Sequence, residues 1–240
     1  MSFRSDGETI ITPSLPFQAE RVTRSYHKLT DGTEISREEH ETIARDADGR
    51  FYDESKLTSS GDKPLPDAGT FHLIADPVAH TTLSWSTLSQ VATSSRLSPS
   101  SHVTVSALPH GRDETSFVSK NSTIVTTQDL GKKTIAGLPA TGTRTITIIL
   151  QGAIGNNRDI VVTHDAWVST DLQITISEKD DNPVSGTRTS EITTINRTAP
   201  EPALFQLPPG YTIRNQSLGG GVVSGLLTAP PPPSPPPSQH

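Results

Sequence analysis

Hydrophobic and polar residues alternate most regularly in the segment 130–179. Within it, Ile146, Ile148 and Leu150 share one parity, whereas Thr145 and Thr147 have the other. Residues two apart lie on one face of a strand, so 143–150 is predicted to be a β-strand with an apolar face and a face rich in hydroxyl groups. Threonine and isoleucine also fit a pleated strand better than a helix.

Two further strands are expected in the same segment. Residues 160–168 form the second, and Leu172, Ile174 and Ile176 alternate with polar residues in the third. Only the three residues 169–171 separate these strands, which is short enough for a hairpin. Strands joined so tightly must be antiparallel, because a parallel crossover needs about a dozen residues or more.

Asp-Gly pairs at 31–32 and 48–49 divide the first part of the chain. They predict a meander of three strands, because glycine tolerates the positive φ of a tight hairpin. The strands are 20–30, 34–45 and 50–52. A short helix over 36–45 is the alternative, since this segment is rich in glutamate and begins with a serine that suits a helix cap.

A second hairpin is expected around Asp76-Pro77, between the apolar run 71–75 and the run 80–86, which contains Trp85. The next stretch, 87–128, is rich in serine and threonine and is predicted to be a flexible insertion between two halves of the sheet.

Three short elements complete the predicted domain. Residues 187–196 form a strand, 200–205 a single helical turn begun by proline, and 211–214 a strand that closes the sheet edge. The whole pattern predicts a mainly β fold: a strongly curved, half-barrel-like antiparallel sheet with a long Ser/Thr-rich insertion and disordered termini. A β-rich α+β fold is the alternative.

Composition supports one folded domain with appendages. Only 31% of the 240 residues are hydrophobic, and the apolar residues concentrate in the strand segments. We expect a disordered segment 1–19, a β domain 20–213, and a Gly/Pro-rich disordered tail 214–240, whose prolines favour extended polyproline conformations.

Charge and cysteine content exclude several classes of protein. A formal net charge of −6 argues against a general nucleic-acid binder, because phosphate neutralisation supplies most non-specific affinity. The chain has no cysteine, so disulfides, thiolate zinc sites and cysteine nucleophiles are excluded. No apolar run approaches the ~20 residues of a transmembrane helix.

Seven phrases of the sequence resemble, in the same order, a family of uncharacterised bacterial envelope proteins that are usually made with a signal peptide. The phrases are LTDGTEI (29–35), RDADGR (45–50), IADPVA (74–79), LGKKTIAGLPATGTRTI (130–146), GAIGN (152–156), WVSTDL (167–172) and INRTAPEPALFQLPPGYTI (195–213). The strand pattern of this family is similar to the curved half-barrel of periplasmic lipoprotein carriers and anti-sigma regulatory partners.

The resemblance implies a periplasmic or cell-envelope location, although the opening MSFRSDGETI contains no apolar segment of a signal peptide. The resemblance implies no activity for this chain, because none is established for the family. The chain departs from the family at Asn182, where an aspartate before proline is common, and in its Ser/Thr-rich insertion and proline-rich tail.

Candidate chemistry is sparse. The eight histidines form no metal-binding spacing, so no metal and no cofactor are predicted. His164 and Asp165 are adjacent in a predicted strand, and their side chains therefore point to opposite faces and form no relay. No GxSxG turn supports a serine nucleophile, and no catalytic residue is predicted.

The apolar sheet face poses the main functional question, because leaving six aliphatic side chains in water is costly. Three arrangements would cover this face: the insertion folds over it, the sheet curls on itself, or a ligand or partner fills the groove. An ordinary core is the simplest explanation. The residues expected at a ligand site are Ile146, Ile148, Leu150, Trp167, Leu172, Ile174 and Ile176.

The sequence thus favours a non-enzymatic envelope protein of carrier or sensor type, whose concave face binds a lipid or a lipidated protein partner. A scaffold that binds partners through sheet edges or the proline-rich tail is the alternative. A hydrolase is the least favoured interpretation.

Overall fold

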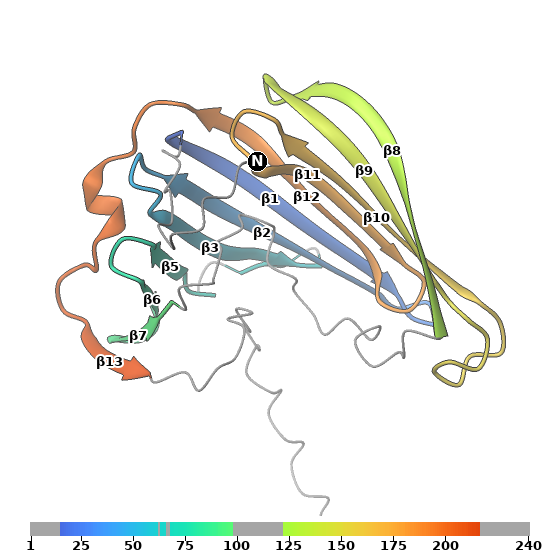
Figure 1. Ribbon diagram of the computed structural model, residues 1–240. Coiled ribbons are helices and arrows are strands. Elements are labelled where there is room, and N and C mark those ends of the chain that lie inside the picture. Colours follow the sequence, from blue (N-terminus) through green and yellow to red (C-terminus); the bar gives the residue numbers. More distant parts are fainter. Residues whose placement is uncertain (1–14, 62, 66–67, 98–121, 217–240) are drawn as a thin grey trace, which may run out of the picture.

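A single large β-sheet that curves but does not close into a barrel makes up the protein (Figure 1). The computed structural model describes residues 15–61, 63–65, 68–97 and 122–216. The elements are β1 (Phe17–Lys28), β2 (Glu34–Arg45), β3 (Phe51–Ser60), β4 (Lys63–Pro64), β5 (Phe71–Asp76), β6 (Thr81–Ser86), β7 (Val91–Arg96), β8 (Thr123–Ile135), β9 (Leu138–Ile149), β10 (Ile160–Ser169), β11 (Thr175–Asn182), β12 (Gly186–Asn196), the 3₁₀ helix η3 (Pro202–Phe205) and β13 (Thr212–Gln216).

The strand order is β13-β7-β6-β5-β3-β2-β1-β12-β11-β10-β9-β8, and the two-residue β4 pairs with β3. All neighbours are antiparallel except β13 and β7, which run parallel at one edge. The predicted mainly β, half-barrel-like class is confirmed. The predicted helix alternative for 36–45 is wrong, because these residues lie within β2.

Two faces are distinguished by burial on the central strand β1. We call inner the face that carries buried Phe17, Ala19 and Arg21, and outer the face that carries exposed Glu20 and Arg24. Directly paired residues on antiparallel strands share a face, so the pairing register extends both names across the sheet.

One end of the inner face is covered by an apolar core, which two residues of β9 with the opposite, outer-face parity, Leu138 and Ala140, also join. Its buried members come from β1, β2, β3, β5, β9, β11, β12 and the β10–β11 connection: Phe17, Ala19, Ile43, Phe51, Ala75, Leu138, Ala140, Leu172, Ile174, Ile176 and Ile192. Arg45 of β2 donates a hydrogen bond from Nη2 to the carbonyl of Leu172 at 2.8 Å, although β12 and β1 lie between β2 and β11 in the sheet. The connection therefore folds over the inner face, and the sheet curls on itself here.

A second core lies on the outer face. Ala44, Tyr52 and Ile74 are paired across β2, β3 and β5, and they pack with Trp85 and Phe205. Phe205 belongs to η3, which lies beside the β5–β7 end of the sheet (Figure 1). The predicted helical turn at 200–205 is thus confirmed as a 3₁₀ helix that covers this core.

Two predicted boundaries are wrong. The strands β7 and the start of β8 fall inside 87–128, which was predicted to be a flexible insertion. The third predicted strand begins at Thr175, because Leu172 and Ile174 lie in the connection before it. The segments 1–14, 98–121 and 217–240, which include most of the predicted disordered termini and insertion, lie outside the described residues.

Gly142 is required by its neighbour across the β9–β10 pair. A Cβ at this position would lie 2.6 Å from Cζ3 of Trp167, whose ring centroid is 3.8 Å from Nζ of Lys133. We expect Gly142→Ala to displace the Trp167 ring and to lower the free energy of unfolding by about 1–3 kcal/mol. Urea titration followed by tryptophan fluorescence measures both effects. Thr143→Ala, at the next and exposed position, is the control, and equal stability of the two variants would contradict this packing.

Candidate binding site

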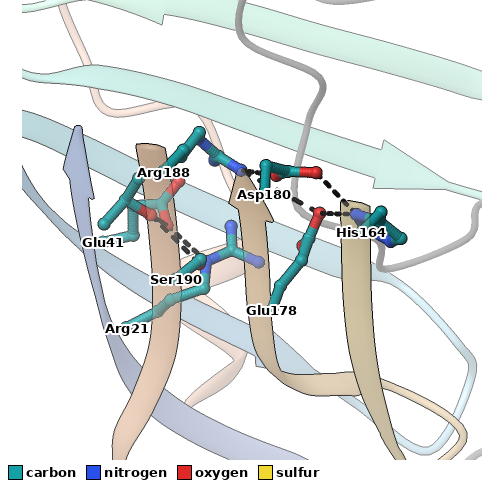
Figure 2. A network of polar contacts seen from close by, with 8 residues as sticks. Arg21, Glu41, His164, Glu178, Asp180, Arg188 and Ser190 are labelled. Carbon is teal, nitrogen blue, oxygen red and sulfur yellow. Dashed lines mark hydrogen bonds and ion pairs between the residues drawn. The ribbon is translucent and has the colours of Figure 1, made fainter. Parts of the chain in front are cut away.

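A row of buried and half-buried polar side chains crosses the middle of the inner face, from β3 to β10, and Figure 2 shows most of it. It lies next to the apolar core on β1, β2, β3, β11 and β12. Its charged members are Arg21, Glu41, Asp53, His164, Glu178, Asp180 and Arg188, and we call these residues the polar network.

One half of the network surrounds Arg21, whose side chain is only 4% exposed. Arg21 on β1 donates to the carboxylate of Glu41, the residue opposite on β2. Its Nη2 also lies 3.7 Å from Oδ2 of Asp53 on β3. One guanidinium therefore faces two buried carboxylates.

Burial and electrostatics act on this group in opposite directions. Burial, reinforced by the negative charge of Glu41, raises the pKa of Asp53 to about 7. Burial disfavours the charge on Arg21, but the attraction of Glu41 and Asp53 outweighs it and raises the pKa of Arg21 above its ordinary value. Near neutral pH, Arg21 is charged while Asp53 titrates.

Hydroxyl groups join this half to the next. Thr23 on β1 donates from Oγ1 to Oγ of Ser190 on β12 at 3.0 Å, and both residues are buried. Ser190 is paired with Glu178 on β11, and Arg188 with Asp180. Glu178 and Asp180 are two residues apart on β11, as Arg188 and Ser190 are on β12, so all four side chains share one face. That face is the inner one, because Ser190 bonds Thr23.

The other half of the network surrounds His164 on β10. Asp180 lies opposite it, and His164 Nδ1 is 2.6 Å from Asp180 Oδ1 and 3.9 Å from Glu178 Oε1. The hydrogen bond with Asp180 raises the pKa of His164, and burial raises the pKa of Glu178. Arg188 Nη1 is 4.0 Å from Glu178 Oε1 and 3.9 Å from Asp180 Oδ2, beyond hydrogen-bonding distance.

Glu178 carries an unsatisfied atom. Its Oε2 is buried and accepts no hydrogen bond within the described part of the chain. A buried carboxylate oxygen without a partner is costly, so it marks a place where a ligand adds an interaction. His164, Glu178 and Asp180 are also the three residues whose donor atoms lie close enough together to hold a metal ion.

The seven residues predicted to bind a ligand do not form one surface. Leu172, Ile174 and Ile176 are each 1% exposed within the apolar core, against which Trp167 also packs. Ile146 and Ile148 are half-buried on the outer face of β9, and Leu150 follows this strand. The expectation of one continuous apolar face is therefore wrong. Ligand contact stays a prediction, and for the three buried residues it requires the core to open.

The polar network was missed by sequence reasoning. Alternation of Glu178 with Asp180, and of Arg188 with Ser190, signals strand faces with polar residues, but it does not show burial. The burial arises from cross-strand pairing, such as His164 with Asp180, which depends on a register that the sequence does not display.

A pocket of about 340 Å³ lies elsewhere, over β12, β1, β2 and β3 near the end of β1. Among its lining residues, Arg24, Tyr26 and Glu38 lie on the outer face. Most of its lining residues have polar side chains, and Arg24 and Glu38 already form an exposed ion pair at 2.6 Å. We therefore place the candidate site at the polar network on the inner face.

No family model and no curated protein matches the chain. Among solved structures, an uncharacterised conserved protein from Thermus thermophilus is similar at 8% identity and a TM-score of 0.40, with 85% of this chain and 91% of that chain covered. The Pseudomonas aeruginosa MucA/MucB complex is similar at 14% identity and a TM-score of 0.36, with 80% and 56% covered. An outer-membrane lipoprotein-sorting protein domain from Vibrio parahaemolyticus is similar at 9% identity and a TM-score of 0.32, with 79% and 88% covered.

These solved structures share a sheet-rich fold with the chain. At these identities and TM-scores the likeness carries no argument about ligands or partners.

Among the described residues, no helix is long and apolar enough to cross a membrane.

Removal of the Arg21 side-chain charge tests the buried half of the network. We expect Arg21→Met to lower the free energy of unfolding by about 3–5 kcal/mol, because Glu41 and Asp53 lose the cation between them. Arg24→Met is the matched control on the same strand, since its pair with Glu38 is exposed and contributes at most about 1 kcal/mol. Chemical denaturation of both variants measures the difference. Similar losses would show that Arg21 is not buried against its partners.

Asp53 gives the stability a pH dependence. In the folded state Asp53 keeps its proton up to pH about 7, whereas the unfolded chain releases it near pH ~4. The stabilisation from this proton is therefore complete below pH ~4 and is lost as the pH rises to ~7. We expect Asp53→Asn to remove this decline in unfolding experiments between these pH values. Asp181→Asn, an exposed change on β11, should retain it, and an unchanged slope in Asp53→Asn would refute the assignment.

Proposed function

We infer that the protein is a non-enzymatic binding protein of carrier or sensor type, whose ligand lies on the inner face between the polar network and the end of β1. The observation that carries this proposal is an amphipathic surface there. Aliphatic side chains flank the polar network on both sides, and no helix within the described residues covers them.

On one side, Ile35 of β2 is 41% exposed and is paired with His27, a residue of the inner face of β1. Leu57 of β3 is half-buried opposite Glu39 of β2. Both side chains lie on the inner face, further from the apolar core than Arg21.

On the other side, Val125 of β8 is 59% exposed, and Val162 of β10 is half-buried. Both are paired with Thr147 of β9, which shares a face with Thr145 and therefore with His164. We call these two groups the aliphatic walls: Ile35 and Leu57 lie on one side of the polar network, and Val125 and Val162 lie on the other.

This arrangement favours an amphiphilic ligand, such as a lipid or the acyl chain of a lipidated partner. Full burial of one aliphatic side chain contributes roughly 1.5–3 kcal/mol, so an apolar chain that covers these walls gains several such contributions. The polar part of the ligand would face the network. The hydrolase alternative gains no support, because no hydrogen bond joins a serine hydroxyl to a histidine ring in the described part of the chain.

Neighbouring residues of β8 provide a matched test. Val125 lies on the inner face, whereas Ile124, 47% exposed, lies on the outer face. We expect Val125→Asp to weaken binding of a fluorescent neutral lipid by about tenfold or more, since the ligand must then desolvate a carboxylate. Ile124→Asp should bind as the unmodified protein does.

Titration of the lipid probe and mass spectrometry of gently purified protein provide the readouts. Equal effects of the two substitutions would place the ligand elsewhere. Absence of both co-purified lipid and probe binding would overturn the proposed function.

A further inference from the structure

We propose that His164, Glu178 and Asp180 bind a divalent transition-metal ion of the Zn²⁺ type. The three residues come from adjacent strands, with His164 opposite Asp180 and Glu178 two residues before Asp180. Their donor atoms all lie within 4.8 Å of one another on the inner face. The site is independent of the amphiphile proposed above, because its ligands are side chains of the chain alone.

The separations suit a metal with short bonds. Zinc lies about 2.0–2.2 Å from histidine nitrogen and carboxylate oxygen, which places two tetrahedral ligands roughly 3.4 Å apart. The distances from His164 Nδ1 to Asp180 Oδ1 and Glu178 Oε1, 2.6 and 3.9 Å, bracket this value. Side-chain rotation that moves the first pair about 0.8 Å apart and the second about 0.5 Å closer brings both to coordinating distances.

The donor set favours transition metals over Ca²⁺ and Mg²⁺. One imidazole and two carboxylates provide mixed nitrogen and oxygen ligands, whereas calcium and magnesium prefer oxygen alone. Three protein ligands also leave a position open to water or to a polar group of a ligand.

Charge provides the second argument. Glu178 and Asp180 carry two negative charges, and Arg188, the nearest guanidinium, lies 3.9–4.0 Å from them without a hydrogen bond. Glu178 Oε2 is buried and accepts no hydrogen bond from any described residue. A cation bound between the carboxylates and His164 would satisfy this oxygen if Glu178 turns Oε2, in place of Oε1, toward the ion. With His164 neutral, as a metal ligand must be, the cation would also balance the excess negative charge.

An ordinary histidine–carboxylate pair is the competing explanation, and the chain contains one for comparison. His40 Nε2 lies 2.9 Å from Glu38 Oε1 on the outer face, where it belongs to no group of three potential ligands among the described residues. A pair of this kind without a third ligand should not hold a metal tightly, because zinc sites need three or four converging ligands.

The test is calorimetric titration of the chelator-stripped full chain with Zn²⁺ alone, with Tm measured in the presence and absence of the ion. We expect one Zn²⁺ per chain, an affinity loss of at least about tenfold in His164→Gln and Glu178→Gln, and a Tm increase on zinc addition that the unmodified protein shows and these two variants lack. His40→Gln should retain both the binding and the Tm increase.

Binding unchanged in His164→Gln and Glu178→Gln would overturn the proposal, as would loss of binding in His40→Gln or no saturable binding in the unmodified protein. Circular dichroism verifies that each variant is folded. If Glu178→Gln fails to fold, Asp180→Asn replaces it, because the Asp180 side chain is 36% exposed and tolerates the change more readily.

Discussion

The buried contact between Arg21 and Glu41 constrains the rest of the sheet. A guanidinium and a carboxylate removed from water stabilise each other only when they meet, so β1 and β2 must pair in one register. A slip of one residue would turn Arg21 outward and Val22 inward, and would separate Phe17 and Ala19 from the apolar core. The ion pair and the core therefore select the same register, one by the penalty for an unpaired charge and the other by apolar burial.

This constraint divides the inner face into three zones along the strands. The apolar core fills the first, where the β10–β11 connection folds over β12 and β1 toward Arg45. The polar network occupies the second. The third, toward the end of β1, retains exposed Ile35 and Val125. Because the first zone is already packed, an added ligand would meet the unpaired Oε2 of Glu178 in the second zone and uncovered aliphatic side chains in the third.

Strand positions were largely predictable, and register was not. Asp-Gly turns and alternation located β1, β2, β10 and β12 closely, the start but not the end of β3, and the end but not the start of β9. The hairpin of β10 and β11 shows the limit. A connection of only 169–171 would pair Val168 with Leu172 and His164 with Ile176, whereas His164 pairs with Asp180. Leu172 and Ile174 alternate with polar residues as a strand does, but they pack into the apolar core from the connection before β11. The longer connection shifts the β10–β11 pairing by four residues.

The Ser/Thr-rich strands β7 and β8 were missed for a different reason. They lie next to or at the sheet edges, where few side chains are buried, so hydrophobic alternation is weak while the backbone pairing persists. The candidate site was missed because its residues are polar and lie on six strands, β3, β2, β1, β12, β11 and β10. Only the tertiary register brings Asp53, Glu41, Arg21, Glu178 and His164 onto one face.

The charge of the network also limits what the inner face accepts. While His164 is neutral, Glu178 and Asp180 exceed Arg188 by one negative charge, and Glu41 and Asp53 exceed Arg21 by one while Asp53 is ionised. An anionic head group approaching this zone meets repulsion, whereas a neutral donor or a cation is attracted. A divalent ion bound by His164, Glu178 and Asp180 would change the net charge of that half of the network from negative to positive. The metal occupancy of that half would then determine whether the adjoining aliphatic walls serve neutral or anionic amphiphiles.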